Sequence, residues 1–80
     1  MSGRTRTILD TKGLNCPLPV LKARRALRAM ATGEELEVLA TDPGAVKDFA
    51  TFAEAAGHEL LEQREAEGVY VFVLRKGERR

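Results

Sequence analysis

The stretch over residues 13–21 (GLNCPLPVL) limits the fold most narrowly, because two prolines flank one residue directly after the only cysteine, Cys16. Proline has a fixed φ and no amide hydrogen, so it fits the first turn of a helix and disrupts later turns. A helical pattern of apolar residues then continues as far as Ala31. The stretch therefore predicts that a helix begins at about Pro17 and that Cys16 lies at its N-terminus.

A thiol at a helix N-terminus faces the positive end of the helix dipole, which stabilises the thiolate. We therefore expect the pKa of Cys16 to lie below that of a free cysteine. The amides of Leu18 and Val20 are candidate hydrogen-bond donors to the sulfur, since early helical amides lack carbonyl partners. Charged residues nearby add to the positive potential or oppose it: Lys12, Lys22 and Arg24 add to it, and Asp10 and Asp42 oppose it.

Length and composition exclude several classes of protein. Eighty residues make a single domain, which we place at residues 1–80 with a structured core over about residues 5–76. Thirteen basic and twelve acidic residues give a net charge of +1, so no strong overall field favours direct nucleic-acid or membrane binding. One cysteine and one histidine cannot form an internal disulfide or a zinc site, which takes about three or four ligands. No cofactor or metal is predicted.

Two features of the chain bear on its location. No apolar run approaches the roughly 20 residues that span a bilayer, and residues 1–6 lack the apolar core of a signal peptide. A lone thiol stays available in a reducing compartment. We therefore expect a cytoplasmic protein, and we expect it to be a monomer.

Hydrophobic periodicity predicts six elements in the order β-α-β-α-β-β. A strand over residues 5–10 precedes the first helix, residues 17–31, for which Gly33 is the expected stop. Asp42 and Pro43 are expected to cap and open a second helix that ends at Gly57. The remaining strands are expected over residues 35–41, 58–64 and 69–74, followed by a frayed tail over residues 76–80.

The order of elements predicts an α+β fold. A β-α-β crossover makes the first two strands parallel, so both helix N-termini open on one edge of the sheet, where such folds place their sites. The last two strands form a hairpin, which gives a two-layer sandwich of a four-stranded mixed sheet with both helices on one face. The expected core faces of the helices are Val20, Ala23, Leu27 and Met30 in the first, and Val46, Phe49, Ala50 and Ala53 in the second, with Phe52 to the side.

Cys16 is the candidate catalytic residue. An exposed thiolate without a second cysteine suits covalent transfer between proteins, as a persulfide or a mixed disulfide. His58 begins the third strand at the expected far edge, which disfavours a Cys–His hydrolase and favours a structural role. The expected site-shaping residues are Gly13, Asn15, Pro17, Leu18, Pro19 and Asp42. A basic set on the first helix is either a solvated face or a docking surface for acidic partners: Lys22, Arg24, Arg25 and Arg28.

The stretch GLNCPLP at residues 13–19 resembles the Cys-Pro-x-Pro motif of the TusA/SirA-like sulfur carrier proteins. Asp42-Pro43 resembles the Asp-Pro that opens their second helix, and Gly57-His58 before an apolar strand is also similar. The likeness extends over about residues 6–76. It implies the fold of the C-terminal domain of translation initiation factor 3.

The resemblance also implies that Cys16 accepts sulfane sulfur as a persulfide from a cysteine desulfurase or rhodanese and relays it to an acceptor protein. Uses of that sulfur in the family include tRNA thiolation, molybdenum cofactor biosynthesis and sulfur oxidation. We expect a carrier with sulfurtransferase-type chemistry rather than a self-sufficient enzyme. The second-helix cysteine of some members is absent at residues 52–54, and Leu18 stands where some tRNA-thiolating members have Glu.

Two other functions remain open on the sequence. A regulatory or RNA-binding module of the same fold is compatible with the basic helix, although that helix lacks aromatic residues for base stacking. A thiol redox protein is also compatible, with glutathione or a partner resolving the mixed disulfide.

Overall fold

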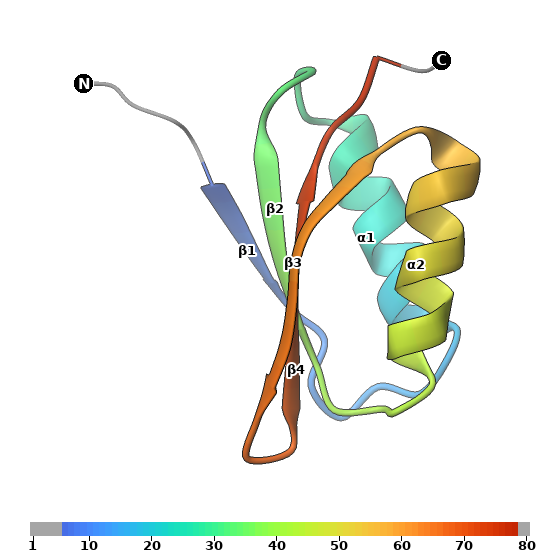
Figure 1. The fold of residues 1–80 in the computed structure, drawn as a ribbon, viewed down its shortest axis with the longest axis vertical. Helices are drawn as coiled ribbons and strands as arrows, with labels where there is room; N and C mark the ends of the chain where they lie inside the picture. The colour runs from blue at the N-terminus through green and yellow to red at the C-terminus, as the bar shows by residue number, and fades with distance from the viewer. Residues whose placement is uncertain (1–5, 79–80) are drawn as a thin grey trace.

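Two helices lie on one face of a four-stranded sheet in the computed structural model, which describes residues 6–78 (Figure 1). The elements are, in chain order, β1 (Arg6–Asp10), α1 (Leu18–Arg28), β2 (Glu35–Ala40), α2 (Ala45–Ala56), β3 (Glu59–Ala66) and β4 (Val69–Arg75). This arrangement confirms the predicted α+β fold. Residue 5, expected in the first strand, lies outside the described residues.

The sheet has the strand order β1-β2-β4-β3. β1 and β2 are parallel, with Ile8 opposite Glu37, and the other two pairings are antiparallel. β3 and β4 form the expected hairpin, whose turn places Glu67 and Gly68 at φ values of 53° and 83°. Because β1 and β2 run in the same direction, the loops that follow them meet at one end of the sheet, at the bottom of Figure 1.

The core lies between the helices and the sheet. Phe49 of α2 stacks on Phe72 of β4 with ring centroids 4.6 Å apart, and both side chains are fully buried. Ala23 and Leu27 of α1 are also buried, as the pattern predicts. Ala50, expected in the core, is exposed, and Ala45 is buried instead, because the buried stripe of α2 runs through positions 45, 49 and 53.

α1 ends three residues earlier than the sequence predicts. The amides of Ala29 and Met30 donate to the carbonyls three residues back, at Ala26 and Leu27, both at 3.1 Å. Such bonds tighten the last turn and end an α-helix without a glycine. Gly33, at φ 94°, is therefore not the cap of α1; it lies in the turn before β2.

The beginning of the C-terminal tail is anchored rather than frayed. Lys76 donates its amide to Glu34 O at 2.8 Å and its Nζ to Met30 O at 2.8 Å, and its carbonyl accepts from Gly33 N at 2.9 Å. A Cβ on Gly77 would lie 1.8 Å from Gly57 O, so this glycine permits close packing on the end of α2. Residues 79 and 80 lie outside the described residues.

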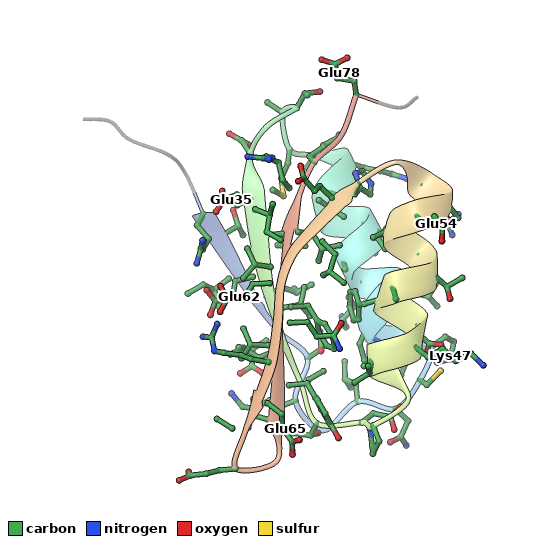
Figure 2. All side chains as sticks on the ribbon, viewed as in Figure 1. Glu35, Lys47, Glu54, Glu62, Glu65 and Glu78 are labelled. Carbon is green, nitrogen blue, oxygen red and sulfur yellow. The ribbon has the colours of Figure 1, made fainter. Side chains whose placement is uncertain are left out.

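Charged side chains cover the sheet face opposite the helices. Glu35 is 1% exposed and accepts from Arg6 Nη2 at 2.8 Å, and Arg75 pairs with Glu59 at 2.7 Å. Figure 2 shows Glu35 and Glu62 on this side of the molecule. Within residues 6–78, neither helix is long and apolar enough to cross a membrane.

Candidate functional site

Hydrogen bonds tie the loop that carries Cys16 to the loop after β2. Thr11 donates its amide and its hydroxyl to Leu39 O, at 2.8 and 2.6 Å. Gly13 N donates to Thr41 Oγ1 at 2.9 Å, and Cys16 N donates to Asp42 Oδ2 at 2.7 Å. The parallel pairing of β1 and β2 thus fixes the backbone of Cys16 at the sheet edge predicted from the sequence.

Asp42 does not cap α2. Gly44 is the N-cap residue and makes no side-chain cap bond, and α2 begins at Ala45 rather than at Pro43. The carboxylate of Asp42 instead receives the amide of Cys16, because the two loops lie side by side and the backbone donor of Cys16 is within its reach. Asp42 therefore contacts the backbone of Cys16 directly.

The other residues expected to shape the site surround the turn into α1. Gly13 has φ 85°, which favours glycine. The amide of Leu18 donates to Asn15 O at 2.8 Å and is not free for the sulfur, contrary to expectation. Pro17 is the N-cap residue of α1, and the peptide bond before it is cis. Pro19 is buried, whereas Leu18 is 45% exposed.

The thiol of Cys16 is exposed and donates a hydrogen bond to Asp48 Oδ2, in the first turn of α2. A shallow groove begins at this contact, lined by Pro17 and Val20 from one side and by Lys47, Thr51 and Phe52 from α2. Figure 2 shows Lys47 at the end of α2 nearest the loops, pointing away from the sheet. The sulfur is thus accessible to another protein along this groove.

The pKa of Cys16 is raised, whereas the sequence predicted a fall. The hydrogen bond to Asp48 is the largest cause, followed by desolvation and by the negative charges of Asp48 and Asp42. An acceptor carboxylate stabilises the protonated thiol, and two nearby negative charges destabilise the thiolate. The expected lowering of the pKa by the helix N-terminus and by nearby basic residues is therefore wrong in direction. Lys12, expected to favour the thiolate, is paired with Asp10 at 3.1 Å.

Slow alkylation of Cys16 by iodoacetamide is therefore expected. Iodoacetamide reacts with the thiolate, so a raised pKa lowers the reactive fraction at neutral pH and moves the midpoint of the rate–pH curve upward. The folded protein should show a higher midpoint than the same protein unfolded in concentrated urea. A midpoint in the folded protein below that of the unfolded protein would contradict the Asp48 contact.

The four basic residues of α1 are exposed but do not gather at the sulfur. Lys22 and Arg25 line a groove against β1 with the half-exposed Leu18 and Leu21. On the other side of α1, a second groove contains the remaining two basic residues, Arg24 and Arg28, beside Phe52 and His58. The structure therefore divides the predicted docking surface into two flanks of one helix.

His58 lies beyond the end of α2, whereas Asp48 and the sulfur lie at its beginning. Its Nδ1 accepts from Gly77 N at 3.1 Å, and its ring is 5.5 Å from that of Phe52. Desolvation, with the charge of Lys76, lowers the pKa of His58. The structure thus does not bring Cys16 and His58 together, as expected. Among residues 6–78, no three His, Cys, Asp or Glu side chains are grouped to hold a metal ion.

Asp48 is the site residue that the sequence reasoning missed. The sequence contains one feature that bears on this role. Asp48 occupies the first turn of the second helix, and the β-α-β topology places the N-terminus of that helix at the same edge as Cys16. Acidic residues in such turns usually interact with the helix dipole. The position of Asp48 is therefore explained without a contact with the thiol, and the sequence alone does not indicate one.

The comparisons with known proteins all indicate the same family. The sequence model described as Sulfurtransferase TusA matches residues 7–76. A sulfur carrier protein TusA from Allochromatium vinosum is 53% identical over 68 residues, covering 85% of this chain and 90% of that protein. A protein of the same name from Pseudomonas aeruginosa is 43% identical over 76 residues, covering 95% and 96%.

A solved structure has the same fold. The crystal structure of a SirA-like protein from Desulfitobacterium hafniense matches with a TM-score of 0.78 and 28% sequence identity. The match covers 92% of this chain and all of that one. Sequence and structure comparisons therefore agree with the resemblance carried by residues 13–19.

Proposed function

This chain belongs to the TusA family of sulfur carrier proteins, and we propose that Cys16 is the residue that carries the sulfur, as a persulfide. The observation that carries the proposal is the position of the only cysteine of the chain. Cys16 is exposed at the sheet edge where the two loops meet, and its sulfur opens on a groove between the starts of α1 and α2.

The proposed transfer has two steps that need no oxidant. Cys16 attacks the terminal sulfur of a persulfide on a donor protein, forming a new S–S bond as the donor's own S–S bond breaks. The donor leaves as a thiol, and the proton lost by Cys16 balances the one that the donor gains. A thiol of an acceptor protein then attacks the terminal sulfur on Cys16 in the same way and restores the free thiol.

A sulfur carrier acts between a donor protein and an acceptor protein. We take a cysteine desulfurase or a rhodanese as the donor class. We take a protein of tRNA thiolation, molybdenum cofactor biosynthesis or sulfur oxidation as the acceptor class. The free thiol suits a reducing compartment such as the cytoplasm. No direct contact with nucleic acid or a membrane is part of this function.

Sulfur loading tests the proposal. The protein is incubated with a cysteine desulfurase and free cysteine, and intact-protein mass spectrometry is expected to show a gain of one sulfur atom. Prior alkylation of Cys16 should prevent the gain. If several active desulfurases and rhodaneses leave the mass unchanged, while Cys16 can still be alkylated, the proposed function is wrong.

The basic residues of α1 support a docking surface for an acidic donor. Two double variants remove the charges of the two flanks: Arg24→Gln with Arg28→Gln, and Lys22→Gln with Arg25→Gln. We expect at least one of them to raise the KM for the donor by about tenfold at low salt, because such charges steer association. The matched control is Arg64→Gln, an exposed arginine of β3 that pairs with Glu62. Equal KM values for all three variants and the wild type would contradict this surface.

A further inference from the structure

The thiol of Cys16 contacts a carboxylate rather than a cation, which is unusual for a cysteine that must become nucleophilic. Reactive cysteines are usually activated by positive neighbours. Here the hydrogen bond of Sγ goes to Asp48 Oδ2, and the second charge acting on the thiol is Asp42, also negative. At rest this arrangement holds the proton on sulfur, so the transfer reaction needs a route for that proton.

We propose that Asp48 accepts the proton of the Cys16 thiol as the sulfur atom is transferred and passes it to the departing thiolate of the donor. The inference rests on the proposed function and assigns a catalytic residue to it. The contact that supports it joins the loop before α1, which carries Cys16, to the first turn of α2, which carries Asp48.

The step balances in atoms and charge. The proton moves from Sγ to Asp48 Oδ2 as Sγ bonds to the terminal sulfur of the donor persulfide. The S–S bond of the donor breaks, and its electron pair stays with the donor sulfur as a thiolate. Asp48 returns the proton to that thiolate. The products are a persulfide on Cys16, a donor thiol and an ionised Asp48, with no external oxidant or base.

Other groups near the sulfur do not fit this role. The carboxylate of Asp42 already accepts from Cys16 N at 2.7 Å and from Gly44 N at 3.4 Å. Lys47 lines the same groove, but an ammonium group has no lone pair for a proton. His58 lies at the other end of α2 and binds Gly77 N. Of the titratable groups described around the thiol, Asp48 alone touches the atom that must lose its proton.

The Asp48→Asn variant separates a proton acceptor from a group that only suppresses the thiolate. Asparagine keeps the size of the side chain and removes its charge and basicity. The control is Glu54→Gln, which removes a carboxylate from the same helix; Figure 2 shows Glu54 further along α2 from Lys47. Each protein is tested in two reactions of Cys16: alkylation by iodoacetamide and sulfur loading from glutathione persulfide.

We expect the two rates to change in opposite directions in Asp48→Asn. Alkylation at neutral pH should become faster, because the thiolate loses its negative neighbour. Sulfur loading should slow by about 100-fold, since positioned acid–base groups contribute at least that much to such steps. The control variant should match the wild type in both reactions, and circular dichroism should show that both variants are folded.

Two results would overturn the role of Asp48, and a third would overturn the proposed function on which it rests. One is an Asp48→Asn variant whose sulfur loading stays unchanged, or becomes faster as its alkylation does. Asp48 would then only suppress formation of the thiolate. Another is equal slowing in Glu54→Gln, which would indicate a general charge effect. Failure of the wild type to load from any donor would remove the proposed function itself.

Discussion

Replacing Cys16 by serine is expected to abolish sulfur transfer and leave the fold intact. The chain has no other cysteine, and a serine hydroxyl cannot hold sulfane sulfur. The side chain at this position is exposed, so its exchange for one of similar size should change the free energy of unfolding by no more than about 0.5 kcal/mol. Transfer is measured as sulfur passed from a loaded donor, and stability by urea unfolding.

A chemically blocked wild type is the matched control for this variant. Protein alkylated at Cys16 keeps every other side chain and should be equally inactive. Sulfur uptake by Cys16→Ser, at even a tenth of the wild-type amount, would place the carrier atom elsewhere and contradict the proposed function. Loss of the cooperative unfolding transition would instead show that Cys16 has a structural role.

Phe49→Ala is expected to have the largest effect on stability, a loss of about 3–5 kcal/mol in the free energy of unfolding. Phe49 is fully buried and stacks on Phe72 at 4.6 Å. An 80-residue domain has a total stability of about 4–12 kcal/mol, so this change removes a large part of it. Phe49 is also the residue after Asp48 in the chain, so its packing holds the start of α2 beside the thiol.

Phe52→Ala provides the comparison for this prediction. Phe52 lies on the same helix but is only partly buried, so the same truncation should reduce stability by clearly less. Urea unfolding of both variants measures the difference. A loss below about 1 kcal/mol in Phe49→Ala, or an equal loss in both variants, would mean that the two phenylalanines do not differ in burial as described.

The fold could be predicted because its determinants are local. Prolines at 17 and 19 predict the start of α1, and Gly57 predicts the end of α2, where it adopts φ 81°. The β-α-β order then requires β1 and β2 to be parallel and brings the two loops together. From these features the sequence places Cys16 at an exposed helix start, where the structure also has it.

The electrostatics of the site could not be predicted in the same way. The sequence shows a helix N-terminus and nearby basic residues around Cys16, which predict a lowered pKa. The opposite direction results from contacts across two loops and the start of α2, between residues 26 and 32 positions apart. The sequence indicates Asp42 as a helix cap whose charge opposes the thiolate, but it does not indicate Asp48, which reaches residue 16 only through the tertiary arrangement.

Whether Cys16 carries sulfur is tested most directly by its chemical state in the protein from its native cell. After rapid alkylation of persulfides and thiols during lysis, the peptide containing Cys16 is isolated without reduction and its mass is measured. If Cys16 is the sulfur carrier, a fraction of this peptide carries one additional sulfur atom, and that fraction disappears on reduction. A mixed disulfide with glutathione in place of any persulfide would contradict the role of Cys16 as a sulfur carrier and indicate a thiol redox protein.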